Sequence, residues 1–185
     1  TYHPTTLEKN TSKKHFEELL AAIEKFKNVK IIFTMPNSDN DGRIIKDMIN
    51  EYVSKNMNKS IVFKSMGQVN YLSALKHADL VIGNSSSGLI EAPSFNIPTI
   101  NIGDRQKGRI KAKSVIDAAP NSDSIFKAIN KSLSKNFRTK IKNITNPYDG
   151  GRVSSKIKKI IGEYNLKLIL KKEFYNLWKY LKIMN

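Results

Sequence analysis

The sequence predicts an α/β protein built on a doubly wound parallel sheet. Short, uninterrupted apolar runs, which are typical of strands buried on both faces, alternate with longer segments whose apolar residues recur at helical spacing. This alternation predicts strand–helix–strand units rather than separate layers of helices and strands. The chain has 185 residues, of which 39% are hydrophobic, so it is long enough for one such domain and short for two.

The first half of the chain predicts two helices and two strands. Apolar residues recur at helical spacing over 14–26 and again over 44–53, and each segment predicts an amphipathic helix. The run VKIIFT at 29–34 predicts a buried strand that ends at Pro36, and IVFK at 61–64 predicts a second strand.

The second half continues the same alternation. A short helix over 71–76 leads into DLVIG at 79–83, the clearest strand in the sequence, and a helix is expected from about Gly88 to Phe95. The remaining expected elements are strands at 98–102 and 114–116 and a helix at 122–133.

We expect two segments in the chain. A Rossmann-like domain covers 1–164, with Gly162 closing its last helix, and residues 165–185 predict an added basic, amphipathic helix. The chain opens on TYHPTT as if in the middle of a fold, and we expect it to be a fragment or a processed piece.

Composition limits the classes of function. The absence of cysteine excludes a disulfide framework and a Cys-based zinc site, and it fits a reducing compartment, so we expect the cytoplasm. No apolar run approaches the roughly 20 residues that span a bilayer. The net charge of +16 suggests an anionic partner, such as nucleic acid, a membrane surface or a phosphorylated ligand, although a solvated basic face is the simpler explanation.

Polar residues follow several of the predicted strands. Ligands bind beyond the carboxyl ends of the strands in an open parallel sheet, so these residues should gather at one edge. They are His3, Asn37 with Asp39, Ser65, the cluster Ser85–Ser87, and Asp104 with Arg105.

The stretch GNSSSG at 83–88 has the features of a phosphate site. Small serines and two glycines at a strand-to-helix turn let an anion approach the unpaired N–H groups of the helix. Plain capping of the helix needs only one serine, so three of them favour phosphate.

Glu91 is expected one turn into that helix, near the same opening. A carboxylate beside a phosphate would be repelled unless it contacts another part of the ligand, and vicinal ribose hydroxyls are a suitable partner. A carboxylate that only complements the helix dipole explains Glu91 equally well.

The loop GDRQKGR adds Arg105, Lys107 and Arg109, whose side chains suit phosphate or form an ordinary exposed basic loop. His3 is a candidate general acid or phosphate donor. The three histidines are too widely spread for a metal site, and we expect no metal or cofactor.

Four motifs in collinear order resemble the C-terminal half of UDP-N-acetylglucosamine 2-epimerases. They are YHPTT at 2–6, MPNSD at 35–39, GNSSSGLIEAPSFNIPTINIGDRQKGR at 83–109 and NPYDGGRVSSKI at 146–157. The YHPTT and GDRQKGR forms are similar to the hydrolysing branch, which makes N-acetylmannosamine and UDP for sialic acid synthesis.

The resemblance implies the UDP-binding half of a two-domain, glycosyltransferase-B-type fold, with the active site in the cleft between the halves. It implies that Ser85 and Ser86 hold the phosphates, that Glu91 accepts the ribose hydroxyls, and that His3 contacts the phosphates or acts on the departing UDP. The full set of implied UDP-binding residues is Asn37, Ser65, Met66, Ser85, Ser86, Ser87, Glu91, Arg105 and Arg109.

The family reaction, by resemblance, eliminates UDP through a glycal and then adds water with inversion at C2. The carboxylates that handle protons are expected in the other domain, outside this chain. We therefore expect the chain alone to bind UDP weakly, if at all, and not to turn over substrate. The full-length protein is expected to be a homo-oligomer.

Two other functions fit the sequence. A related enzyme, either a 2-epimerase of a diacetamido UDP-sugar or a glycosyltransferase, would have the same half-fold. A basic nucleic-acid-binding domain would explain the charge, but no helix-turn-helix, zinc or RNP-like motif is present.

Overall fold

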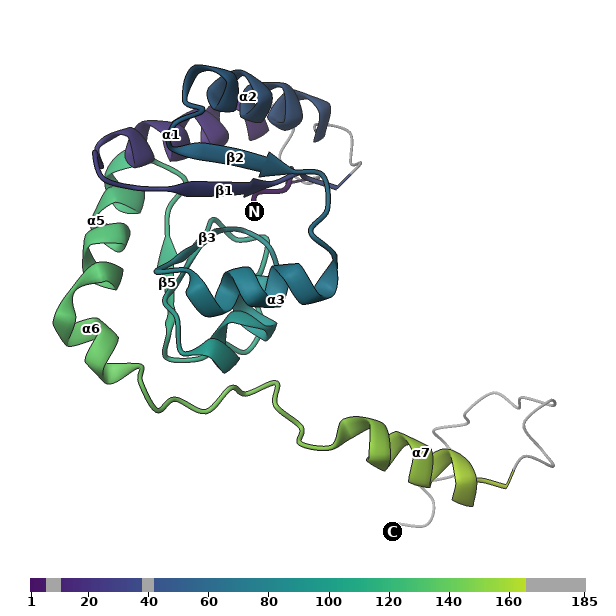
Figure 1. The fold of residues 1–185 in the computed structure, drawn as a ribbon. Coiled ribbons are helices and arrows are strands. Elements are labelled where there is room, and N and C mark those ends of the chain that lie inside the picture. The colour runs from purple at the N-terminus through teal and green to yellow at the C-terminus, as the bar shows by residue number, and fades with distance from the viewer. Residues whose placement is uncertain (6–10, 38–41, 166–185) are drawn as a thin grey trace, which may run out of the picture. The chain divides into compact units, whose positions relative to one another are not determined.

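The structure is a computed structural model that describes residues 1–5, 11–37 and 42–165 (Figure 1). The chain divides into two compact units, Thr1–Asp149 and Gly150–Asn185. Asp39 and nearly all of the helix expected over 165–185 lie outside the described residues.

The first unit alternates helices and strands, as the sequence predicts. Its strands are β1 (Ile31–Thr34), β2 (Ser60–Phe63), β3 (Val81–Gly83), β4 (Thr99–Ile102) and β5 (Val115–Ala118). Its α-helices are α1 (Ser12–Glu24), α2 (Gly42–Lys55), α3 (Gly67–His77), α4 (Ser87–Ile90), α5 (Ser122–Leu133) and α6 (Lys135–Lys140), and a 3₁₀ helix, η1, covers Ala92–Phe95.

Every strand pair in the described residues is parallel, which confirms the predicted fold class. β1 pairs with β2, and β4 lies between β3 and β5, with Ile100 aligned to Ile82 on one side and to Ile116 on the other. All four residues of β4 are buried, as expected of a strand with neighbours on both sides. The described strands therefore form two ladders, of two and three strands.

The core is formed where helices cover these ladders. In α1, Phe16, Leu19 and Ile23 follow helical spacing, and all three are buried. α1 packs against α5 and α2, and α2 lies along the β1–β2 pair (Figure 1). Complete burial of a side chain such as Phe16 or Ile125 stabilises the fold by about 1.5–3 kcal/mol.

The prediction of a single helix from Gly88 to Phe95 is wrong. α4 ends at Ile90, and the next turn is the 3₁₀ helix η1. Pro93 explains the break, because it has no N–H to donate to the carbonyl four residues earlier. The turn ends at Asn96, whose left-handed backbone (φ 53°) stops the chain from continuing as a helix.

The second unit contains helix α7 (Val153–Glu163), which ends one residue after the expected boundary at Gly162. Its apolar residues recur at helical spacing, and they are exposed; they are Val153, Ile157, Ile160 and Ile161. None of the helices in the described ranges is long and apolar enough to span a membrane.

Candidate nucleotide site

The polar residues that follow the strands meet through hydrogen bonds at the carboxyl ends of β1, β3 and β4. The N-terminal segment lies beside the end of β3, and it carries His3 into this group. Of the residues predicted to gather at one edge, His3, Asn37 and Arg105 are joined by these contacts, which centre on Asn84, and Ser85 is the next residue in the chain.

Asn84 is the central residue of the site, and only 1% of it is exposed. Its side-chain amide pairs with the main chain of His3 in both directions. The His3 N–H donates to Asn84 Oδ1 at 2.7 Å, and Asn84 Nδ2 donates to the His3 carbonyl at 2.8 Å. A buried amide that satisfies both of its partners fixes the backbone of the facing segment.

The main-chain carbonyl of Asn84 joins the loop after β3 to the loop after β4. It accepts hydrogen bonds from Arg105 Nη1 at 3.1 Å and from Gln106 Nε2 at 2.8 Å. Gln106 is buried, whereas most of its neighbours in this loop are exposed. Asn84 and Gln106 were not among the predicted site residues. The sequence offers one sign of them, because each has an amide side chain and stands next to a predicted site residue, Ser85 or Arg105.

The ring of His3 contacts the loop after β1. The Asn37 N–H donates to His3 Nδ1 at 3.1 Å. An Nδ1 that accepts a hydrogen bond belongs to a neutral imidazole with its proton on Nε2. His3 can therefore act as a hydrogen-bond donor through Nε2, the role predicted for a residue that faces phosphate.

The three serines have different surroundings. The Ser87 hydroxyl is hydrogen-bonded to the Tyr71 hydroxyl from α3, and Ser85 Oγ accepts a hydrogen bond of 3.4 Å from the Ser87 N–H. Ser86 is the N-cap residue of α4 and makes no side-chain cap hydrogen bond. Ser85 and Ser86 are thus better placed than Ser87 to offer hydroxyls to a ligand.

Gly83 makes this close arrangement possible. Its φ is +143°, and a Cβ built on it would lie 1.7 Å from the carbonyl oxygen of Thr1. Only glycine permits that approach and that backbone conformation.

Glu91 lies at the junction of α4 and η1, and it is half-buried. Within the described parts of the chain, its carboxylate has no hydrogen bond or ion pair. It lies close enough to Tyr71 to act on that phenol: burial raises the pKa of Tyr71, the hydrogen bond with Ser87 opposes the rise, and the charge of Glu91 adds to it. A half-buried carboxylate without a protein partner is suited to accept hydroxyl groups from a ligand.

Asn146, from the NPYDGG motif, supports both sides of this junction. Its Nδ2 donates to the Ile90 carbonyl at 2.8 Å and to Ser94 Oγ at 2.7 Å. Two residues later, the Tyr148 hydroxyl donates to the Ile110 carbonyl at 3.0 Å, next to the basic loop. The motif therefore has a structural role in holding the segments that carry Glu91 and Arg109.

Three further predicted residues also lie outside the hydrogen bonds that centre on Asn84. Ser65 is exposed, and its hydroxyl accepts a hydrogen bond of 3.3 Å from the Gly67 N–H at the start of α3. Met66 is half-buried beside it, and Arg109 is exposed. No group of three or more His, Cys, Asp or Glu residues that could hold a metal ion occurs among the residues that the structure describes.

Comparison with known proteins identifies the family of this chain. The family model of UDP-N-acetylglucosamine 2-epimerase matches residues 1–162. The chain belongs to this family. This confirms the resemblance of the four motifs.

Two relatives and one solved structure are informative. A GDP/UDP-N,N'-diacetylbacillosamine 2-epimerase (hydrolyzing) from Campylobacter jejuni is 42% identical over 96% of this chain and 46% of its own length. The polysialic acid biosynthesis protein P7 of Escherichia coli is 38% identical over 80% of this chain and 37% of its own length. The chain therefore spans less than half of these curated relatives.

A crystal structure of the Methanocaldococcus jannaschii UDP-GlcNAc 2-epimerase, in complex with UDP-GlcNAc and UDP, has a TM-score of 0.67 to this chain. The two sequences are 19% identical, and the matched region covers 88% of this chain and 44% of the Methanocaldococcus jannaschii chain. At that identity the likeness concerns the fold, and it confirms the predicted relation to one half of the two-domain epimerase fold.

Proposed function

We propose that this chain is the UDP-binding half of a hydrolysing UDP-sugar 2-epimerase. The observation that carries the proposal is the arrangement around Asn84, whose hydrogen bonds hold His3 and Arg105 at the end of β3. The hydroxyls of Ser85 and Ser86 follow in the chain, and Glu91, whose carboxylate has no partner among the described residues, lies at the end of α4. Hydroxyl and cationic donors next to a lone acceptor suit a ligand that has both phosphates and hydroxyl groups, as a nucleoside diphosphate does.

In the proposed complex, Ser85 and Ser86 donate to the diphosphate. Glu91 accepts the two ribose hydroxyls, which separates its charge from the phosphates. The Nε2–H of His3 and the guanidinium of Arg105 face the same diphosphate and stabilise the negative charge that grows on UDP as it leaves. Asn37 completes the pocket by holding the His3 ring, while Ser65 and Met66 lie near the base and Arg109 adds positive charge.

The reaction breaks the bond between the sugar C1 and the UDP oxygen and removes the C2 proton, and water is then added with inversion at C2. This chain contributes the stabilisation of the leaving group. The base that takes the C2 proton belongs to the other half of the family fold, so the chain alone should not release product.

Two sugars are candidates for the substrate. UDP-N-acetylglucosamine is the substrate that the four motifs suggest, and UDP-N,N'-diacetylbacillosamine is favoured by the 42% identity to the Campylobacter jejuni relative. The two differ in the sugar, and we propose that the other half of the fold distinguishes them. An enzyme that combines this chain with its own second half, assayed against both UDP-sugars, separates the candidates by their kcat/KM.

The nucleotide is tested directly on this chain. We expect UDP to bind more tightly than GDP and inorganic diphosphate in a titration followed by NMR, and we expect no N-acetylmannosamine when UDP-N-acetylglucosamine is added. Equal affinity for UDP, GDP and single-stranded DNA, with a steep dependence on salt, would instead favour a basic nucleic-acid-binding domain.

A further inference from the structure

The break between α4 and η1 changes the partner of a main-chain carbonyl. In a continuous α-helix the Ser94 N–H would donate to the Ile90 carbonyl, four residues earlier. In the structure it donates to the Glu91 carbonyl at 3.1 Å, which is the shorter step of a 3₁₀ turn. Asn146 Nδ2 replaces it as the donor to the Ile90 carbonyl, at 2.8 Å. The side chain of Asn146 therefore supports the break itself.

Both polar atoms of the Asn146 side chain are hydrogen-bonded, and only 8% of the residue is exposed. Nδ2 also donates to Ser94 Oγ at 2.7 Å, and Oδ1 accepts from the Tyr148 N–H at 2.9 Å. A buried amide whose donors and acceptor are all satisfied is held in one orientation. This amide therefore fixes Ile90 and Ser94, which lie on either side of Glu91, to a single point.

The main chain of Glu91 is fixed within the same turns. Its N–H donates to the Ser87 carbonyl at 2.9 Å, and its carbonyl accepts from the Ser94 N–H. These bonds determine the direction in which the Glu91 side chain leaves the backbone. The carboxylate is half-buried and has no hydrogen bond or ion pair among the described residues. Its position therefore depends on the backbone that Asn146 holds.

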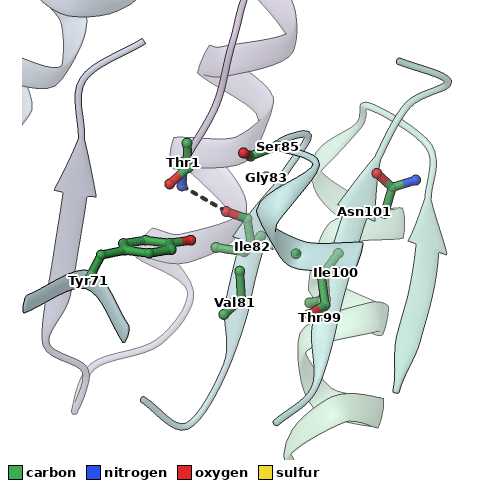
Figure 2. A pocket seen from close by; sticks show the side chains of 10 residues that line it. Thr1, Tyr71, Val81, Ile82, Gly83, Ser85, Thr99, Ile100 and Asn101 are labelled. Carbon is green, nitrogen blue, oxygen red and sulfur yellow. Dashed lines mark hydrogen bonds between the residues drawn. The ribbon is translucent and has the colours of Figure 1, made fainter. Parts of the chain in front are cut away.

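The start of α4 is held by other segments of the chain. Figure 2 shows Thr1 and Tyr71 beside β3, where the Thr1 nitrogen donates to the Ile82 carbonyl at 3.1 Å. The Tyr71 hydroxyl is hydrogen-bonded to Ser87, in the first turn of α4. Loss of the Asn146 side chain should therefore displace the end of α4 next to η1 and leave the proposed phosphate-binding serines in place.

We propose that Asn146 is a positioning residue for Glu91, and that it thereby makes the site prefer a ribonucleotide to a 2′-deoxyribonucleotide. The inference rests on the proposed function, in which Glu91 accepts the two ribose hydroxyls. A carboxylate accepts two vicinal hydroxyls only when both of its oxygens face that edge of the sugar, so a small displacement weakens a charge-assisted hydrogen bond. The contacts to the diphosphate come from other residues and should not change.

The test compares UDP with 2′-deoxy-UDP as ligands of the full chain, in titrations followed by NMR. We expect the unaltered chain to bind UDP about tenfold more tightly, as the loss of one charge-assisted hydrogen bond implies. Asn146→Ala should reduce this preference to about twofold or less, by raising the Kd for UDP while the Kd for 2′-deoxy-UDP changes by less than about twofold. The matched control is Tyr148→Phe, which removes from the same turn a hydroxyl that donates to the Ile110 carbonyl. This control should keep the full preference for UDP.

A second measurement uses no nucleotide. Amide exchange at Glu91 and Ser94 should be at least about tenfold faster in Asn146→Ala, whereas exchange at Ile125 in α5 should not change. Ser94→Ala is a milder variant, because it removes only one of the two acceptors of Asn146 and alters an exposed residue. It should give a smaller rise in the exchange rate at Glu91 and in the Kd for UDP.

Unchanged exchange at Glu91 and Ser94 in Asn146→Ala would overturn the inference and leave the proposed function standing. An equal rise in the Kd for both nucleotides would also overturn it, because Asn146 would then stabilise the fold without positioning the carboxylate. Equal Kd values of UDP and 2′-deoxy-UDP for the unaltered chain would instead contradict the ribose contact in the proposed function, and the inference would fail with it.

Discussion

The loop after β3 and the loop after β4 both carry residues proposed to bind the diphosphate, but they are held in different ways. The loop after β3 is anchored through buried Asn84, and its backbone is fixed against His3 and Thr1. The loop after β4 has one buried anchor, Gln106, while Arg105, Lys107 and Arg109 are exposed. Its glycines at 103 and 108 have φ of +72° and +81°.

This difference indicates a division of labour. Groups fixed by a buried network hold one geometry and discriminate between ligands, because a ligand that does not fit leaves them unpaired. Exposed cations attract any anion and lose much of that attraction in salt. The loop after β3 should therefore determine which ligand binds, and the loop after β4 should contribute charge.

The largest effect is expected from removing the anchor of the first loop. Asn84→Ala deletes both hydrogen bonds to the main chain of His3, and we expect it to lower the free energy of unfolding by about 2–4 kcal/mol. The matched control is Asn130→Ala, on the exposed face of α5, which should change stability by less than about 0.5 kcal/mol. Urea unfolding measures the free energy of unfolding of both variants. A similar decrease in the two would mean that Asn84 does not anchor the loop.

The second effect concerns the Thr1 nitrogen, which binds the end of β3. Burial lowers the pKa of this ammonium to about 6 in the folded chain, from 8.0. As the pH falls from 8 to 6, the unfolded chain takes up the proton first, so the folded state should lose up to about 2–3 kcal/mol.

Acetylation of the N-terminus removes that ionisation, and the acetylated chain should keep its stability through this pH range. Comparing the two forms by urea unfolding at each pH cancels the contributions of the histidines, which both forms share. Identical pH profiles would contradict the burial of this amine.

The third effect separates ligand choice from charge. Glu91→Gln should raise the Kd for UDP by about tenfold, which is 1.4 kcal/mol, and change the Kd for inorganic diphosphate by less than about twofold. Glu163→Gln, on exposed α7, is the control for loss of one negative charge. An equal rise in the Kd for UDP and for inorganic diphosphate would mean that Glu91 has a structural role instead.

The smallest effect is expected in the second loop. Arg105 is oriented by its hydrogen bond to the Asn84 carbonyl, so Arg105→Ala should raise the Kd for UDP about fivefold. Arg109→Ala should raise the same Kd about twofold or less. Titrations at two salt concentrations should show that both losses shrink as salt rises. The opposite order of the two variants would mean that the loop rearranges around the ligand.

Much of the fold was predictable because its signals are local. The helix over 122–133 has the predicted bounds of α5, since Asn121 caps it and its apolar residues keep helical spacing. The serines after DLVIG lie at the end of β3 because a buried run followed by glycine and serine ends a strand. Pro93 could have predicted the break after α4, although the apolar spacing alone indicates one continuous helix.

The rest of the site depends on contacts between distant residues. Asn84 and His3 lie 81 positions apart, and no local pattern specifies that the amide of one holds the main chain of the other. The bond between Tyr71 and Ser87, which distinguishes Ser87 from the other two serines, likewise joins α3 to α4. Even the split of the sheet into two ladders depends on which main-chain groups find partners, which the composition of β1 and β3 does not determine.

The central claim, that the segment after β3 binds UDP, is tested most directly by titrating the ¹⁵N-labelled chain with UDP and following its amide signals. We expect saturable shifts for Gly83 to Glu91 and for His3 and Asn37, with weaker shifts of the same signals for uridine and for inorganic diphosphate. Shifts that are confined to the exposed basic residues and are reproduced by any polyanion would contradict the account.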